Sequence, residues 1–213
     1  IDDHQDIIPL KQKKDFELVE LPESLYDAIR VFLINVAIRN LRGHNLDKHN
    51  SMLVHVSLHP FIHMREHNLI EVYLGEIRSA VVAFAKLPNY STQSKHFKEL
   101  EETFKVRQLE INKNLEYTWR EVLDSLHECI ETVIIRQVHQ YKNVEPLEYK
   151  DSNPVNVIVV GGLSLSRGFT LEGLSVSYFI RNTKLYDTLM QMARWFGYRD
   201  GYEDLCRIYL TLD

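Results

Sequence analysis

Two stretches in the last third of the chain carry residue types that bind phosphate. The first follows an apolar, strand-like run and combines glycines, hydroxyls and an arginine, and the carboxylate of Glu172 stands at its end. Its glycine and polar residues before Glu172 are Gly161, Gly162, Ser164, Ser166, Arg167, Gly168 and Thr170. Glycine lets the backbone turn and approach a ligand closely, and a guanidinium can bind two phosphate oxygens at once. A short glycine-rich run also occurs in ordinary turns, so the second stretch has to support the first.

The second stretch is a predicted helix at residues 184–196. At 100° per residue its apolar side chains fall on one face, whereas Asp187, Gln191 and Arg194 fall together on the opposite face. A glycine ends the helix, and Arg199 follows it. An arginine placed over a γ-phosphate neutralises charge that develops during hydrolysis and is worth about 10³–10⁵ in rate. The two stretches together favour phosphate binding over an ordinary polar surface.

The order of the remaining elements is typical of an α/β protein. Apolar spacing predicts helices at residues 21–43 and 60–86, and further helical structure at 93–130. Apolar or β-branched runs predict strands near residues 51–58, 132–140, 155–160, 174–180 and 205–211. This alternation indicates a mostly parallel sheet with helices on both faces. Ligands of such sheets bind beyond the carboxyl ends of the strands, and Gly161 stands at such an end.

Composition bounds the class of protein. The chain has 213 residues, 45% of them hydrophobic and 26% charged, which is ordinary for a globular protein. No apolar run is long enough to cross a bilayer, and Cys129 and Cys206, which lack metal-ligand spacing, are typical of buried thiols in the cytoplasm. The net charge of −5 argues against this chain clamping DNA tightly by itself.

The chain divides into an extension and one domain. Residues 1–20 are charged and lack periodicity, which predicts an extension or linker. Residues 21–213 form the domain, with a helical insertion at about residues 90–130. Because the chain begins without methionine and stops just after a strand-like run, we expect it to be a piece of a longer protein.

These residues also carry a family resemblance. The run GGLSLSRGFTLEGLSVSYF, followed by DTLMQMARWFGYRDGYEDLCRIY, resembles the Z1 domain. That family occurs with superfamily 2 helicase-type ATPases, often in bacterial restriction and phage-defence systems, and is commonly labelled an endonuclease. The resemblance implies a RecA-like fold of the P-loop NTPase helicase C-terminal type. It also implies a nucleic-acid-dependent ATPase in which this chain is the C-terminal motor domain.

The resemblance assigns roles to individual residues. Residues 161–172 correspond to helicase motif V, and Gln191, Arg194 and Arg199 correspond to motif VI, the arginine-finger motif. This implies nucleotide contacts by Gly161, Gly162, Arg167, Gly168 and Gln191, nucleic-acid contacts by Ser164, Ser166 and Thr170, and catalytic roles for Arg194 and Arg199. Ala193 replaces a glycine of the usual Gln-x-x-Gly-Arg-x-Gly-Arg pattern and Arg199 lies further out than usual, which leaves open which arginine is the finger.

Half of an ATP site is missing from this chain. The sequence contains no G-x-x-x-x-G-K-[ST] loop and no Asp-Glu pair at the end of an apolar strand. These parts belong to an N-terminal RecA-like ATPase domain, which we expect in the same protein. The expected cofactors are therefore ATP and Mg²⁺ in the full-length protein, with the Mg²⁺ ligands outside this chain. The expected partners are that domain and nucleic acid, with DNA favoured.

The histidines offer a competing interpretation. His55, His59, His63 and His67 recur every four residues, and His63–His67 fits the zinc-protease pattern H-x-x-E-H. However, Pro60 separates the first two from the helix that holds the others, and no third ligand stands out. We therefore predict polar surface histidines and no metal site.

Two further functions stay open. Glu148 and Lys150 match the end of a Mg²⁺-nuclease motif, but they lie in a proline-flanked loop, and Asp151 and Asp204 do not visibly build a two-metal site. The alternatives are thus a Mg²⁺-dependent DNA endonuclease domain, which the residues disfavour, and a regulatory or interaction module on a degenerate motor fold.

Overall fold

The part of the chain that the structure describes contains five parallel strands in one sheet. The computed structural model describes residues 1–5, 7–9, 12, 16–43, 48–57, 59–89, 94–110, 116–138, 149–150, 154–161, 171–180 and 201–211. The strands are β1 (Asn50–His55), β2 (Val133–Val138), β3 (Asn156–Gly161), β4 (Leu174–Phe179) and β5 (Arg207–Leu210). They lie in the order β2-β3-β1-β4-β5, and every neighbouring pair is parallel. The prediction of an α/β protein with a parallel sheet is confirmed.

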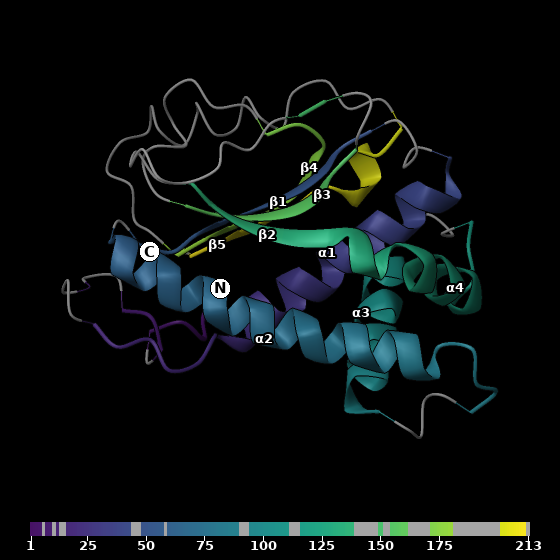
Figure 1. Cartoon of the computed structure of the whole chain (residues 1–213), viewed down its shortest axis with the longest axis horizontal. Coiled ribbons are helices and arrows are strands. Elements are labelled where there is room, and N and C mark those ends of the chain that lie inside the picture. The colour runs from purple at the N-terminus through teal and green to yellow at the C-terminus, as the bar shows by residue number, and fades with distance from the viewer. Residues whose placement is uncertain are drawn as a thin grey trace.

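The four described α-helices cover one face of this sheet (Figure 1). They are α1 (Glu23–Leu41), α2 (Pro60–Phe84), α3 (Lys95–Glu110) and α4 (Trp119–Cys129). α1 and α2 contact the strands directly, and α3 and α4 pack against these two helices. The helix predicted at residues 184–196 lies outside the described residues. None of the helices that the structure describes is long and apolar enough to cross a membrane.

Local sequence explains where these helices begin. α1 starts after Pro22 with an acidic residue in its first turn, and α2 has Pro60 at its first position, where no backbone donor is needed. α4 begins with a capping box, in which the hydroxyl of Thr118 accepts from the N–H of Glu121 and the Glu121 carboxylate accepts from the N–H of Thr118. The helical region predicted at residues 93–130 therefore consists of two helices.

The three central strands β3, β1 and β4 are almost entirely buried, whereas the outer strands β2 and β5 are partly exposed. Burial on both faces is typical of the central strands of a parallel sheet. Alternate residues of the three central strands pack into the main core under the helices: Met52, Val54, Ile158, Val160, Val176 and Tyr178. The other set forms a smaller cluster on the opposite face, which includes Leu53, Val157, Val159, Leu174 and Phe179. The sheet thus separates two apolar layers, and the four described helices contribute to only one of them.

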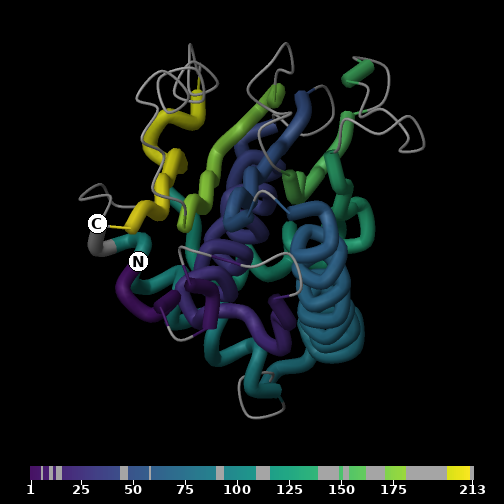
Figure 2. Tube along the Cα trace, turned by 90° about the vertical axis from the view of Figure 1, so that its left-hand side faces the viewer, coloured from purple at the N-terminus to yellow at the C-terminus, as the bar shows by residue number. Residues whose placement is uncertain are grey.

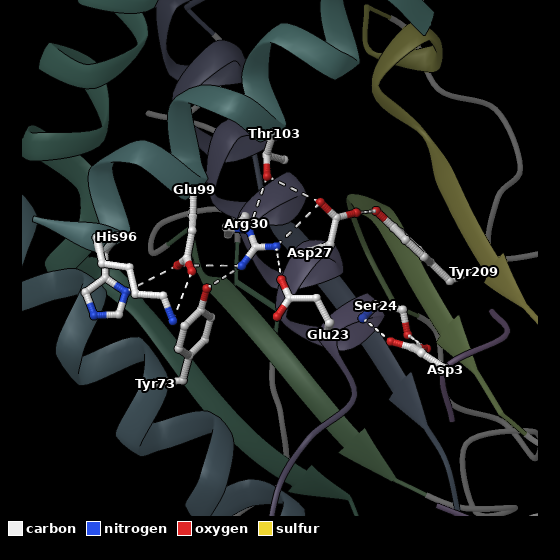
Figure 3. Close-up of polar contacts among 11 residues, drawn as sticks. Asp3, Glu23, Ser24, Asp27, Arg30, Tyr73, His96, Glu99, Thr103 and Tyr209 are labelled. Carbon is white, nitrogen blue, oxygen red and sulfur yellow. Dashed lines mark hydrogen bonds and ion pairs between the residues drawn. The ribbon is translucent and has the colours of Figure 1, made fainter. Parts of the chain in front are cut away.

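A buried arginine ties the helices together (Figure 3). Arg30 of α1 donates to the hydroxyl of Tyr73 in α2 at 3.0 Å and to Thr103 in α3 at 3.1 Å. One turn earlier, the carboxylate of Asp27 accepts from the hydroxyl of Tyr209 in β5 at 2.7 Å. Because a buried charge is costly unless it is hydrogen-bonded and paired, this network fixes how α2, α3 and β5 sit around α1.

The first residues of the chain pack against the rest of the domain. The amino group of Ile1 donates to the carbonyl of Leu210 in β5 at 2.8 Å, and Asp3 accepts from the N–H of Ser24 at 2.8 Å. Ile8 and Leu18 are buried in the main core. Figure 2 shows this purple segment beside the yellow strand β5. The described part of residues 1–20 thus belongs to the packed body of the protein.

Candidate functional site

The carboxyl ends of three adjacent strands meet where the first predicted motif begins. The register aligns Val54 of β1 with Val160 of β3, and His55 of β1 with Phe179 of β4. Gly161, the last residue of β3, therefore lies level with His55. Of the residues predicted to contact nucleotide or nucleic acid, Gly161 is the one within the described part of the chain, and it ends β3 at the carboxyl ends of the strands, as predicted.

The other predicted site residues lie outside the described residues. They are Gly162, Ser164, Ser166, Arg167, Gly168, Thr170, Gln191, Arg194 and Arg199. The structure does, however, describe the residues that precede these two segments, Gly161 and Ile180, which are called the two chain exits below. The first segment follows Gly161 at the end of β3, and the second follows Ile180 just after β4. The backbone N–H of Ile180 donates to the carbonyl of His55 at 3.3 Å. Both exits therefore flank the end of β1.

The sheet order makes this edge a topological switch point. From β1 the chain continues to β2, the outermost strand on one side of the sheet. From the neighbouring strand β4 it continues to β5, the outermost strand on the other side. In open parallel sheets, ligands bind in the crevice that forms where neighbouring strands send the chain in opposite directions. The arrangement of the strands thus favours the same edge as the glycine motif.

His55 occupies the middle of this edge. Its side chain is fully buried, and its Nδ1 lies 2.6 Å from the carbonyl oxygen of Gly161. Because a carbonyl only accepts, Nδ1 carries the proton and donates it. The ring also contacts Phe179 edge-on, at 6.0 Å between centroids. In the sequence, His55 stands out only as one of the regularly spaced histidines, although its place at the end of an apolar strand-like run is a signal for such a position.

The spaced histidines do not come together. His59 precedes α2, His63 is buried with its Nε2 2.8 Å from the carbonyl oxygen of Ser57, and His67 is only half-buried. Across the described ranges, no group of three His, Cys, Asp or Glu side chains is placed to hold a metal ion. The geometry of these histidines therefore gives no support to the zinc-protease pattern. The prediction that they lie on the surface is wrong for His55 and His63, which are buried and lie within hydrogen-bond distance of backbone carbonyls.

The acid of that pattern, Glu66, is fully buried in α2. Neither of its carboxylate oxygens has a hydrogen-bond partner among the described residues. Burial raises the pKa of Glu66 to about 8. This carboxyl group is therefore protonated near neutral pH and behaves as part of the core.

Glu172 lies at the opposite edge of the sheet from Gly161. Ser51 of β1 is aligned both with Val157 of β3 and with Leu174 of β4, so Glu172 stands at the amino ends of the strands. Gly161 is four residues beyond Val157, or about 13 Å at the usual rise of a strand. The expectation that the Glu172 carboxylate belongs to the phosphate-binding edge is wrong, because the chain between two parallel strands must run from one edge to the other.

The chain re-enters the described part at residues 201–205, and α1 holds it there. The guanidinium of Arg39 lies over the ring of Tyr202 at 4.0 Å from its centroid. Arg42 donates to both carboxylate oxygens of Asp204, at 2.9 and 2.7 Å. The amide of Asn35 donates to the carbonyl of Leu205 at 2.9 Å. The segment with the predicted arginines is thus anchored beside His55 at one end and on α1 at the other.

The family of the protein follows from comparison with known families. The family model of the Z1 domain matches residues 24–213. This chain belongs to the Z1 domain family. The match covers α1 and all five strands of the Z1 domain, including both predicted motifs. Comparisons with curated proteins and with solved structures gave no significant match.

Of the residues considered for a nuclease, the structure of the Z1 domain describes Lys150 and Asp204. Asp204 is bound by Arg42, and Tyr149, the neighbour of Lys150, forms a hydrogen bond with the hydroxyl of Ser51 at 2.8 Å, near the amino ends of the strands. Glu148 and Asp151 lie outside the described residues. The ion pair with Arg42 makes Asp204 a structural carboxylate of the α1 anchor.

Both cysteines are free thiols. Cys129 at the end of α4 is buried, which confirms the prediction, and burial raises the pKa of its thiol to about 12. Cys206, which precedes β5, is only half-buried, so the prediction of a buried thiol is wrong for this residue. A thiol with so high a pKa is not a nucleophile at neutral pH, so Cys129 is a packing residue.

Proposed function

We propose that this Z1 domain is the C-terminal, RecA-like motor domain of a nucleic-acid-dependent ATPase. The observation that carries the proposal is the placement of the two chain exits. Gly161 leads into the predicted phosphate-binding loop and Ile180 into the predicted arginine segment, and both flank His55 at the switch point of a parallel sheet. Phosphate ligands are expected at such an edge.

In this proposal the domain supplies one wall of an ATP site. Gly161 and Gly162 let the backbone approach the phosphates, and Arg167 and Gln191 contact them. Arg194 and Arg199 supply the positive charge that stabilises the developing charge on the γ-phosphate. The opposite wall, with the ligands of Mg²⁺, comes from an N-terminal RecA-like domain of the same protein. In such sites the Mg²⁺ neutralises charge on the phosphate oxygens.

Nucleic acid is the proposed second ligand. The hydroxyls of Ser164, Ser166 and Thr170 suit contacts to a phosphate backbone, which need no sequence specificity. The net charge of −5 means that this domain adds little electrostatic affinity of its own, so most of the binding energy must come from the rest of the protein. We propose DNA as the nucleic acid and a cytoplasmic restriction or phage-defence system as the setting.

The experiment that tests this function compares the full-length protein with the Z1 domain alone. ATP turnover is measured with Mg²⁺ and with double-stranded DNA, RNA or no nucleic acid. We expect the full-length protein to hydrolyse ATP faster with DNA, and the Z1 domain alone to be inactive. The proposal fails if the full-length protein shows no turnover under any condition. Cleavage of the DNA by the Z1 domain alone would favour the nuclease alternative instead.

A further inference from the structure

We propose that His55 is a positioning residue of this site. Its imidazole holds the peptide bond that leads from β3 towards the phosphate-binding loop, while its backbone holds the chain that leaves β4. One buried residue thereby fixes the two exits relative to each other, the first through its side chain and the second through its backbone carbonyl. The inference rests on the function proposed above and assigns a role there to a residue outside both motifs.

The contact with Gly161 is suited to this role. On the β1 side, the last aligned pair of the ladder is Val54 with Val160, so the side chain of His55 reaches one residue beyond it. Gly161 has no side chain and more conformational freedom than any other residue, so its peptide plane can be held only through backbone atoms. The carbonyl of Gly161 receives the His55 hydrogen bond at 2.6 Å in a fully buried environment. A hydrogen bond in such a dry environment is stronger than one in water.

The contacts of His55 with β4 complete the link. The carbonyl of His55 accepts from the N–H of Ile180 at 3.3 Å, and its ring packs edge-on against Phe179. The chain two residues after His55 is held to α2, since the Nε2 of His63 lies 2.8 Å from the carbonyl oxygen of Ser57. His55 therefore connects two exits that lead to different motifs while the chain just after it is held to a long helix.

The hydrogen-bond geometry defines a matched pair of substitutions. The contact uses Nδ1, and the side-chain amide of asparagine can place an N–H donor close to the Nδ1 position of histidine. The amide of glutamine reaches instead to the Nε2 position, on the far side of the ring. His55→Asn should therefore retain the tether to Gly161, whereas His55→Gln should lose it, although both put an uncharged amide into the same buried position.

The test measures ATP turnover by the full-length protein in the presence of DNA. We expect His55→Gln to lower kcat/KM for ATP at least tenfold and His55→Asn to stay within about threefold of the parent. Thermal melting should show the two variants equally folded. Ser177→Ala is the control, because this buried serine of β4 has no hydrogen-bond partner among the described residues and its removal should leave turnover unchanged. Equal turnover of His55→Gln and the parent, or an equal loss in both variants, overturns the inference.

A second measurement is independent of activity. In protein labelled with ¹⁵N-histidine, NMR spectra compared with those of His55→Asn assign the His55 ring nitrogens, and we expect Nδ1 to carry the proton. An unprotonated Nδ1 overturns the tether whether or not ATP is hydrolysed. If the parent protein shows no ATP turnover while Nδ1 is protonated, the proposed function fails, and the role of His55 in that site fails with it, although the contact with Gly161 stands.

Discussion

Replacing Glu66 by glutamine should stabilise the Z1 domain at neutral pH. Glu66 is fully buried in α2, and its oxygens have no hydrogen-bond partner among the described residues. Burial raises the pKa of this carboxyl from an ordinary value of 4.5 to about 8. Glutamine has nearly the same shape and stays neutral at every pH, so the Glu66→Gln variant keeps the packing and removes the titration.

The magnitude follows from the two pKa values. The folded state holds the proton up to about pH 8, whereas the unfolded chain releases it above 4.5. The stability is therefore fully present below pH 4.5 and is lost as the pH rises towards 8. At pH 7 the unfolded carboxyl is about 2.5 pH units above its pKa while the folded one is still protonated, which costs the parent about 3 kcal/mol. At pH 5 the same difference is only about 1 kcal/mol.

The assay is urea unfolding followed by circular dichroism at pH 5, 6 and 7. We expect the advantage of Glu66→Gln over the parent to grow by about 2 kcal/mol between pH 5 and pH 7. Glu71→Gln is the control, because Glu71 is exposed on the same helix and its replacement should change stability by no more than about 0.5 kcal/mol. A difference between Glu66→Gln and the parent that does not change with pH would refute the reasoning, since Glu66 would then be ionised and stabilised in the folded protein.

Two further substitution pairs test the scaffold around the site. Gly173 has φ +66°, and a Cβ there would lie 1.7 Å from the carbonyl oxygen of His49; Gly173→Ala should lower the unfolding free energy by about 3 kcal/mol or more. Gly75→Ala in α2, where a Cβ meets open space, should raise the unfolding free energy by about 0.5–1 kcal/mol. Equal melting temperatures of Gly173→Ala and Gly75→Ala would contradict both expectations. A double-mutant cycle of Arg42→Ala and Asp204→Ala should give a coupling free energy of about 1–2 kcal/mol in urea unfolding, because their contact is bidentate and mostly shielded from water. A coupling free energy near zero would show that this ion pair does not hold residues 201–205 against the end of α1.

Local signals sufficed to predict most elements of this fold. Pro22 and Pro60 marked the starts of α1 and α2. The continuous apolar run at residues 157–160 predicted a strand buried on both faces, and the run at 174–180 predicted a further strand, both as observed. The division between α3 and α4 was not predicted, although the capping box that begins at Thr118 is visible in the sequence as Thr-x-x-Glu. Tertiary order was beyond this reasoning, because five similar apolar strands do not reveal which one lies in the centre.

The candidate site shows the same division between local and global information. The glycines after β3 were recognisable from their residue types, and Gly161 does end a strand at the expected edge. The role of His55 depends on β1 lying between β3 and β4, and no pattern within a few residues of His55 encodes that neighbourhood. Glu172 was predicted at the carboxyl ends of the strands but lies at their amino ends, because the prediction relied on its closeness in sequence to the glycines. Residues close in sequence can lie at opposite edges of a parallel sheet, because each connection between strands crosses its full length.

The central claim is that this Z1 domain completes an ATP site with arginines, and ATP turnover by single-arginine variants tests it most directly. In the full-length protein with DNA and Mg²⁺, we expect Arg194→Ala or Arg199→Ala to lower kcat by about 10³-fold or more. Arg120→Ala is the matched control, because Arg120 lies on the exposed surface of α4 in an ion pair with Asp124, and it should keep parental turnover. Parental turnover in both Arg194→Ala and Arg199→Ala would contradict the claim.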